Sequence, residues 1–442
     1  MKWLFLLVLI SGTPVLAMLL RAQQRLIVPT CFLLGVAMFL LGPSLWTAPI
    51  SWPYWPGVVR GIYVSFIDPV AIALIMATPR TRNPSTVKLA FALYCLGVVA
   101  SSFGSERSMM PIAFYGWQSL RGAILFVAIA RVAASVEGAP VALIAGLSVG
   151  IMVEAGVVVY QFTKSVVRPG GTFNNSNYLG LSLDYVVFPA IALLLGTRRL
   201  WPALTVLAAL AIAIFGGSRA TLAVVGFGLP LTTILSILYR KSTRKYSLAG
   251  MAAILLIIAA PLMIWGANQR SQDVLESSDQ MRTAMKLAAR MIISDYPMGI
   301  GANEYVPFAN ARGYNERAGV PWNEENRVVP VHNTYYLVTA ETGFIGLFGL
   351  FATLGAFILL GIRAMRRKSA DESGELVPGL LATMIVISIH IAFEFVALDF
   401  LLQSLFALAA GMLVGLHARA KSAALTPQAL TQPVIVPALQ PS

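Results

Sequence analysis

The chain has 442 residues, of which 57% are hydrophobic and only 12% are charged. A soluble domain carries about 25% charged residues, so this composition excludes a soluble globular protein and predicts a helical protein that crosses a membrane many times. The formal net charge is +13, but the basic residues lie in short loops between apolar runs, which is typical of membrane proteins and argues against nucleic-acid binding.

The apolar stretches predict an all-α, polytopic integral membrane protein with about 12–13 transmembrane helices. The first stretch follows a lysine, as in a signal peptide, but Arg21 and Arg25 come after it without a clear cleavage site, so we expect a retained helix. Arg121 interrupts the fifth stretch, whose polar and aromatic first half also fits a position in the membrane interface. The candidates are 3–20, 26–41, 61–78, 87–103, 110–130, 141–159, 178–195, 201–215, 220–239, 248–265, 344–362, 380–395 and 400–417.

Basic residues gather in short loops, which predicts that these loops face the cytoplasm. On each side of the long loop 266–331, one spanning stretch separates the loop from a basic cluster. The loop is therefore predicted to lie on the opposite side of the membrane, outside the cytoplasm. It carries seven basic and eight acidic residues, and this mixed charge is ordinary for a segment that is not cytoplasmic. The basic clusters lie at 80–88, 198–199, 240–245 and 363–368.

The same orientation brings three residues to one side of the membrane. The loop 161–177 and the turn 216–219 also face outward, so Arg168, Arg219 and His332 are expected on the same face. Nothing in the counting of basic loops required these residues to coincide.

Three regions follow from this pattern: N-terminal transmembrane helices over 1–160, a transmembrane core over 161–417 that includes the large outer loop, and a tail over 418–442. The tail contains several prolines and is predicted to be disordered. Cys31 and Cys95 lie inside apolar runs, so they are expected to be core residues without a metal or a disulfide.

Residues 331–350 read VHNTYYLVTAETGFIGLFGL and place one of only three histidines where a polar loop meets a long apolar run. A single helix over 332–362 would reach about 46 Å, at about 1.5 Å per residue, and would overshoot a hydrocarbon core of about 30 Å. We therefore predict a short helix over 333–341, a break at Thr342–Gly343 and a spanning helix after it.

A polar and aromatic face is predicted on the short helix. Tyr335, Tyr336 and Thr339 follow His332 at three, four and seven residues, so they are expected on its face. Glu341 falls about half a turn away and need not be its partner. A histidine at this position could serve only as a hydrogen-bonding group at the start of a helix, and this alternative stands beside a functional role.

Two arginines lie in the shorter outer segments. Arg219 belongs to GGSRA, between two spanning stretches, where an arginine is either an interface anchor or a fixed fork that grips phosphate. Arg168 opens RPGGTFNNSNYLG, a turn rich in hydrogen-bonding side chains that precedes a helix. Backbone donors at a helix start favour anions, although an ordinary capped turn has the same composition.

The stretch 281–293 of the outer loop has a helical pattern, with apolar residues on one face and Arg282, Lys286 and Arg290 on another. It predicts an amphipathic helix on the membrane surface. Its basic stripe either touches lipid phosphates or forms a phosphate-binding wall for a substrate.

Ionisable residues also interrupt the apolar stretches, and such residues are often functional. Two of them, His390 and Glu394, are four residues apart and are expected to pair on one helix face. The set comprises Asp68, Glu154, Asp184, His390 and Glu394.

Four segments in this order resemble the O-antigen ligase and Wzy polymerase family of bacterial envelope glycan enzymes. They are GGTFNNSNYLG, GGSRA, RTAMKLAARMIISDYPMGIGANEY and HNTYYLVTAETGFIGLFG, within residues 168–350. The resemblance implies an inverting, metal-independent glycosyltransferase of the bacterial inner membrane that needs no cofactor. Its active site would face the periplasm, so the outer loop would be periplasmic.

The family's chemistry implies a glycan donor on undecaprenyl pyrophosphate and, as acceptor, a hydroxyl of a lipid A core or of another lipid-linked glycan. His332 would activate the acceptor, and Arg219 with Arg168 or Arg282 would hold the pyrophosphate. The site residues predicted in this way are His332 and Arg219 for catalysis, and Arg168, Arg282, Tyr335 and Tyr336 for binding pyrophosphate or glycan.

Ligase and polymerase share these motifs, so an O-antigen ligase and a Wzy-type polymerase of O-antigen or exopolysaccharide both remain open. A secondary transporter would show inverted repeats and coupled charges near the membrane midplane, and no repeat is visible by eye. A scaffold protein would not need arginines and a histidine that converge from three loops.

Overall fold

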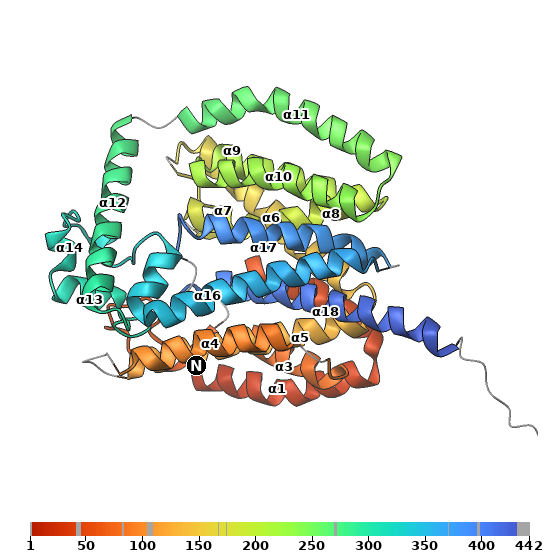
Figure 1. Cartoon of the computed structure of the whole chain (residues 1–442), viewed down its shortest axis with the longest axis horizontal. Coiled ribbons are helices and arrows are strands. Elements are labelled where there is room, and N and C mark those ends of the chain that lie inside the picture. The colour runs from red at the N-terminus through yellow and green to blue at the C-terminus, as the bar shows by residue number, and fades with distance from the viewer. Residues whose placement is uncertain are drawn as a thin grey trace, which may run out of the picture.

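The computed structural model describes residues 2–40, 46–81, 84–103, 109–166, 168–173, 175–268, 272–369, 371–395 and 398–430. Long helices lie side by side in a bundle, and α12 crosses one end of it (Figure 1). The helices are α1 (Lys2–Ala22), α2 (Ile27–Leu40), α3 (Ile67–Ala77), α4 (Ser85–Ser101), α5 (Met110–Ser135), α6 (Ala139–Thr163), α7 (Ser176–Leu183), α8 (Val187–Gly196), α9 (Trp201–Phe215), α10 (Arg219–Tyr239), α11 (Thr243–Asn268), α12 (Gln272–Asp295), α13 (Tyr305–Ala311), α14 (Tyr314–Arg317), α15 (Glu324–Arg327), α16 (Thr334–Arg366), α17 (Leu376–His390) and α18 (Phe400–Leu430).

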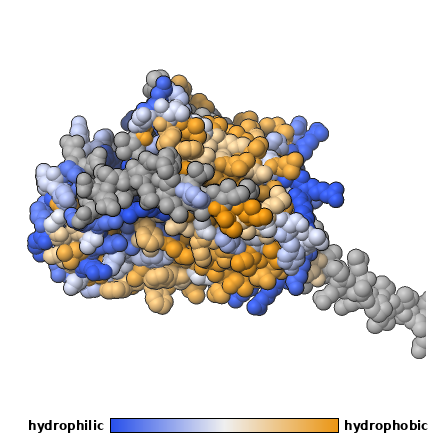
Figure 2. Space-filling model, turned by 90° about the horizontal axis from the view of Figure 1, so that it is seen from above, coloured by the Kyte–Doolittle hydropathy of each residue, from blue (hydrophilic) through white to orange (hydrophobic). Residues whose placement is uncertain are grey.

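The protein is an all-α, polytopic membrane protein. Within the described residues, eight segments are long and apolar enough to cross a membrane, and four shorter apolar helices accompany them. With α11, which has 26 residues, a helix covers all or most of every predicted stretch. Hydrophobic residues spread over the middle of the face shown in Figure 2, and hydrophilic residues gather toward its ends.

A short hairpin replaces the start of one predicted helix. β1 (Trp46–Ser51) and β2 (Gly61–Ser65) pair antiparallel, and α3 begins only after them. The helix predicted over 61–78 is therefore wrong in its first residues. The sequence Gly-Ile-Tyr-Val-Ser favours a strand, and pairing with β1 satisfies backbone groups that a frayed helix end would leave open.

The basic clusters meet at one end of the bundle, which we call the basic end. The segment 371–375 collects several of them in ion pairs: Arg199 lies 2.5 Å from Glu372, and Lys245 lies 2.8 Å from the buried Glu375. We call the opposite end, with α12 to α15 and the start of α16, the loop end. This agrees with the sequence-based prediction that the basic loops share one side.

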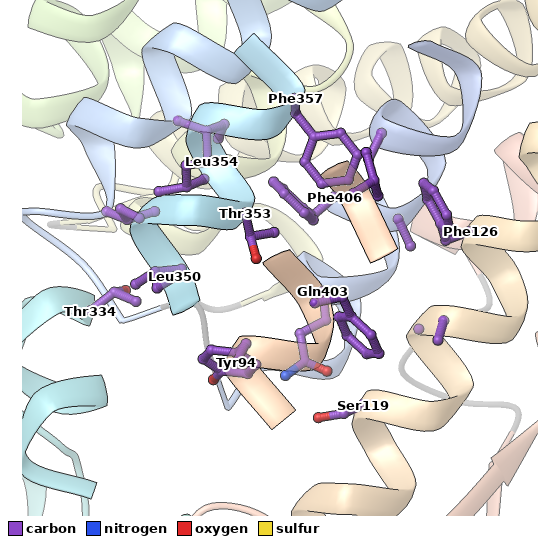
Figure 3. Close-up of a pocket in the computed structure, with 18 of the residues that line it drawn as sticks. Tyr94, Ser119, Phe126, Thr334, Leu350, Thr353, Leu354, Phe357, Gln403 and Phe406 are labelled. Atoms are coloured by element: carbon purple, nitrogen blue, oxygen red, sulfur yellow. The ribbon is translucent and has the colours of Figure 1, made fainter. Parts of the chain in front are cut away.

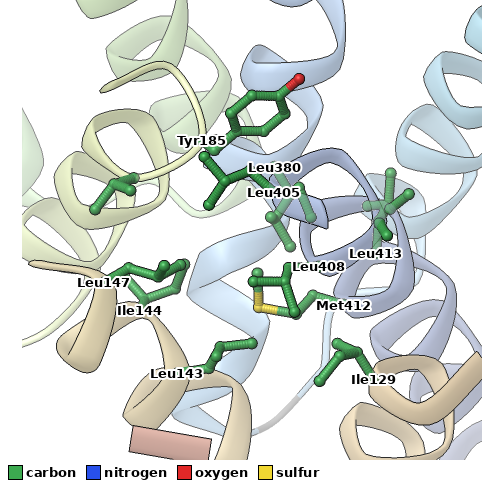
Figure 4. Packing of buried hydrophobic residues seen from close by; sticks show 14 of the residues in the cluster. Ile129, Leu143, Ile144, Leu147, Tyr185, Leu380, Leu405, Leu408, Met412 and Leu413 are labelled. Carbon is green, nitrogen blue, oxygen red and sulfur yellow. The ribbon is translucent and has the colours of Figure 1, made fainter. Parts of the chain in front are cut away.

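Small residues let the spanning helices approach closely. A Cβ added to Gly97 of α4 would lie 2.5 Å from the Cα of Gly346 in α16, and such contact between backbones stabilises helix pairs in lipid. Leu147 of α6, Leu380 of α17 and Met412 of α18 lie in the same buried cluster (Figure 4). The core therefore joins N-terminal and C-terminal helices into one body.

Helix α16 is broken as predicted. Gly343 has φ 67° and ψ −172°, a conformation that is essentially restricted to glycine. The break frees main-chain carbonyls, and the preceding turn PMGIG pairs with them: Ile300 N donates to Ala340 O at 3.0 Å, and Gly301 N donates to Glu341 O at 2.9 Å. This turn, to which the sequence alone assigned no separate role, stabilises the broken helix that carries the site.

Helix α12 has the predicted amphipathic pattern but a different partner. Met285, Ala288 and Ile292 on its apolar face are buried in a second cluster that includes Tyr305 and Leu337. The prediction that this face lies on the membrane surface is wrong, because the loop end supplies enough apolar side chains to cover it.

Helix α5 is continuous, so its first half is not a separate interfacial segment. Arg121 is buried inside the protein, 2.8 Å from Asp68 and with its guanidinium 3.8 Å from the centre of the Phe400 ring. The ion pair and the ring contact compensate for removing this charge from water.

The C-terminal helix is longer than predicted. Helix α18 continues to Leu430, so disorder from residue 418 is wrong for its first part. The extension is rich in alanine, which has the highest helix propensity. Residues 431–442 of the predicted tail lie outside the described residues.

Labelling with a membrane-impermeant thiol reagent tests the orientation. In a background without Cys31 and Cys95, we expect a cysteine at Ser277 to be labelled in intact cells and a cysteine at Ser242 to be labelled only after lysis. The reason is that basic loops are retained in the cytoplasm. Labelling of Ser242→Cys but not Ser277→Cys in intact cells would invert the topology.

Candidate active site

The start of α16 docks onto the turn after α17. The side chain of Asn333 accepts from the amide three residues on at 3.0 Å and donates to Ala392 O at 2.7 Å. The Thr334 hydroxyl donates to Glu394 O at 2.7 Å. These bonds fix the backbone of the turn, and they bring the Glu394 side chain next to His332.

His332, Glu394 and Arg282 form one network. His332 Nδ1 lies 3.1 Å from Glu394 Oε2, and Arg282 Nη2 lies 3.0 Å from Glu394 Oε1. The Glu394 side chain is 1% exposed, whereas that of His332 is 16% exposed. An ionised carboxylate only accepts hydrogen bonds, so it keeps the proton of a neutral His332 on Nδ1 and leaves Nε2 as the basic nitrogen. A base held by a third group in this way is typical of active sites.

Arg219 joins this network through α12. It stands at the first position of α10, where Ser218 caps the helix, and its Nη2 lies 3.0 Å from Asp279. Asp279 precedes Arg282 by three residues, so both lie on one side of α12. The side chains of Arg219 and Asp279 are 47% and 61% exposed. Such an open ion pair is weak, so the guanidinium is accessible from solvent.

The loop that carries Arg168 lies against the turn that carries Arg219. Buried Glu154 accepts from the amide and the hydroxyl of Thr172 at 2.8 and 2.5 Å. The carbonyl oxygen of Pro169 is 3.4 Å from where a Cβ on Gly216 would lie. Arg168 itself is exposed. The structure thus brings both segments to the loop end, and it gives Glu154 a structural role in holding the loop.

The two tyrosines do not share the environment of His332. Tyr335 donates to Ser388 O at 2.5 Å and stacks on Phe351 at 5.1 Å between ring centres. Tyr336 accepts from Arg290 Nε at 2.9 Å on α12. The predicted single face is therefore wrong, because His332 lies before the helix start and its side chain turns toward Glu394. Tyr336 contacts α12 at the loop end, and Tyr335 packs into the helix bundle.

His390 and Glu394 do not pair with each other. His390 Nδ1 lies 2.6 Å from Asp184, both fully buried, because α17 ends at His390 and the chain turns before Glu394. The sequence marked Glu394 as a buried carboxylate but suggested the wrong partner. Among the described residues, no three His, Cys, Asp or Glu side chains gather as a metal site would require.

An apolar pocket of about 320 Å³ opens between α4, α5, α16 and α18. Figure 3 shows Thr334, the first residue of α16, and Phe357 and Phe406 among its lining side chains. On α5 the lining runs from Tyr115 to Val127, which is about 18 Å at about 1.5 Å per residue. The pocket is therefore long and apolar. Its wall includes Thr334, which is two residues from His332 in the chain.

Residues 203–351 match a family model described as O-antigen ligase. This part of the chain is therefore similar to the O-antigen ligase family. It runs from α9 to the first half of α16 and contains Arg219, Arg282 and His332, whereas Arg168 and Glu394 lie outside the matched residues. No curated protein matches the chain. The family supports a ligase- or polymerase-type glycosyltransferase activity in general.

Replacement of Glu394 by glutamine tests the network. The amide keeps the size of the side chain but loses the charge that orients His332 and pairs with Arg282. We expect kcat of the family's transfer reaction to fall about 10- to 100-fold with an altered pH profile. Glu316→Gln, which removes an exposed partner of Arg327 at the loop end, is the control. If Glu394→Gln and Glu316→Gln have equal rates and equal pH profiles, Glu394 has only a structural role.

Proposed function

We propose that this O-antigen ligase family protein transfers a glycan from undecaprenyl pyrophosphate to an acceptor hydroxyl at the periplasmic face of the bacterial inner membrane. The observation that carries the proposal is the buried Glu394, which holds His332 and Arg282 together at the loop end. The base, His332, and a cation that can bind an anion, Arg282, then lie next to each other. Glycan transfer from a lipid pyrophosphate requires both groups.

His332 acts on the acceptor. The acceptor hydroxyl attacks the anomeric carbon, the bond from that carbon to the pyrophosphate oxygen breaks, and Nε2 of His332 takes the hydroxyl proton. Attack opposite the leaving group inverts the configuration of the anomeric carbon. The imidazolium formed in this step is stabilised by the Glu394 carboxylate on its other nitrogen.

The arginines act on the leaving group. Negative charge grows on the pyrophosphate as the sugar leaves, and guanidinium groups fixed nearby stabilise that charge more in the transition state than before it. Arg219 pairs with Asp279, which lies one helical turn before Arg282 on α12, and Arg168 belongs to the neighbouring loop, which lies against the turn before Arg219. This chemistry is carried by side chains and needs no metal or cofactor.

The apolar pocket beside α16 suits a long isoprenoid chain. Thr334 lines it and is two residues from His332, so a lipid tail there would leave its pyrophosphate near the network. The long, apolar lining supports a lipid-linked donor over a soluble nucleotide sugar.

A strain that lacks this protein distinguishes the possible acceptors. A ligase predicts bare lipid A core and accumulated lipid-linked chains in that strain. A polymerase that feeds a ligase predicts cores with a single repeat unit, and an exopolysaccharide polymerase predicts normal lipopolysaccharide without secreted polymer. Of these, we propose the ligase. Normal lipopolysaccharide together with normal exopolysaccharide would reject glycan transfer as the function.

A further inference from the structure

A second cavity, of about 420 Å³, lies at the loop end and belongs to neither the arginine network nor the lipid pocket. Its walls come from the β1–β2 hairpin, α5, α7 with the loop before it, and the start of α18 with the residues just before it. The volume falls within the range of about 300–1,000 Å³ that is usual for small-molecule sites. The lining combines aromatic rings with polar side chains: Trp46, Tyr63, Tyr178, Arg121, Thr172 and Asp399.

One aromatic residue connects this cavity to the candidate active site. The Phe395 ring lies 5.6 Å from the His332 ring and also 5.6 Å from the Tyr178 ring, measured between centres. Tyr178 forms part of the cavity wall. The arginines of the network, in contrast, reach His332 by way of Glu394 and α12. Phe395 therefore links the wall of the cavity to His332 by ring contacts in which the arginines take no part.

The polar groups of the cavity are held in place by other residues. Arg121 is fixed by Asp68 at 2.8 Å, Thr172 is held by Glu154, and Asp399 accepts from the amide of Leu402 at 2.8 Å. Groups that are fixed before binding lose little freedom when a ligand arrives. They are suited to recognising hydroxyl groups at defined positions.

The hairpin supplies the aromatic wall. Trp46 and Tyr63 pack edge to face at 4.8 Å between ring centres, and Trp46 is 49% exposed. Asn303 holds the connection between β1 and β2 in place: its side-chain amide donates to Val59 O at 2.8 Å and accepts from Val59 N at 3.0 Å. A sugar ring has a C–H face that packs on aromatic rings and a rim of hydroxyls that bond to carboxylate, guanidinium and hydroxyl groups.

We infer that this cavity binds the sugar units of the acceptor and presents their hydroxyl to His332, an inference that rests on the proposed function. The occupant is a neutral or weakly charged pyranose unit of a glycan, whether that glycan comes from a lipopolysaccharide core or from a lipid-linked repeat unit. The N-terminal hairpin, which lies outside the matched family domain, then determines which acceptor is used.

The inference is tested by measuring oligosaccharide binding and transfer kinetics of Trp46→Ala. The control is Trp52→Ala, because Trp52 follows β1 in the same hairpin, is 36% exposed and does not line the cavity. Binding is measured by calorimetry in the His332→Ala background. The probes are core oligosaccharide freed from the host's lipopolysaccharide by mild acid and, separately, oligosaccharide freed from its lipid-linked intermediate. We expect one of the two to bind, and Trp46→Ala to weaken it about tenfold through loss of the aromatic face.

In the otherwise wild-type protein, the same substitution should raise KM for the acceptor about tenfold and leave KM for the lipid-linked donor unchanged. The inference is overturned if neither oligosaccharide binds, if Trp46→Ala equals Trp52→Ala, or if only the donor KM rises. Transfer that continues with an unaltered acceptor KM rejects the cavity but keeps the proposed function. Binding that depends on Trp46, together with no transfer activity of the wild-type protein, supports the cavity as a glycan site and rejects the proposed function.

Discussion

Replacing His332 by alanine is expected to lower glycan transfer about 100- to 10,000-fold, because the acceptor hydroxyl loses the base that takes its proton. The variant should still insert and fold, since Asn333 and Thr334 keep the bonds that dock α16 onto the turn after α17. Donor binding should persist, because Arg219 and Arg282 remain. The measurement is the rate of glycan transfer by purified protein, with KM for the donor determined alongside.

His417→Ala is the matched control for this substitution. His417 lies on α18 and contacts Arg367 at the basic end, away from the network, so its variant should retain the wild-type rate. A His332→Ala protein that transfers glycan at the rate of His417→Ala would leave His332 with only a structural role at the helix start.

Replacing Arg219 by lysine is expected to lower transfer at least about tenfold, although the positive charge is kept. A guanidinium offers a planar fork that holds two phosphate oxygens at once, whereas an ammonium group acts as a point charge. Because Arg219 is the first residue of α10 and its side chain is about half exposed, at 47%, lysine should fit without disturbing the helix. The loss should appear mainly in kcat, because the charge on the pyrophosphate grows in the transition state.

Arg317→Lys provides the comparison for Arg219→Lys. Arg317 lies at the loop end over the ring of Tyr314 at 4.2 Å, outside the network, so its variant should behave as wild type. If Arg219→Lys transfers glycan as fast as Arg317→Lys, Arg219 is an interface anchor and does not grip the donor.

The sequence was sufficient to predict the helical membrane fold because hydropathy and basic loops reflect the bilayer directly. The break at Gly343 was predictable too, since one unbroken helix would have been too long for the membrane. The hairpin before α3 was not predicted, because a short apolar strand and the start of a spanning helix have the same hydropathy.

The site was predictable only in part. His332, Arg219 and Arg282 stood out as rare or charged residues in family motifs, and the structure links them through α12. Glu394 was paired with the wrong residue, because its true partners are distant in the sequence, and i, i+4 spacing reports only neighbours on one helix. The separation of Tyr335 from His332 was missed because helical spacing applies only to residues inside the helix.

The most direct test of glycan transfer by this protein follows both products of one reaction. Purified protein in lipid nanodiscs is given the host's undecaprenyl-pyrophosphate-linked glycan together with acceptor lipid, and mass spectrometry quantifies glycosylated acceptor and released undecaprenyl pyrophosphate. We expect the two products to appear in equal amounts with the wild-type protein and both to disappear with His332→Ala. Release of undecaprenyl pyrophosphate without glycosylated acceptor, or equal yields from the two proteins, would contradict this expectation.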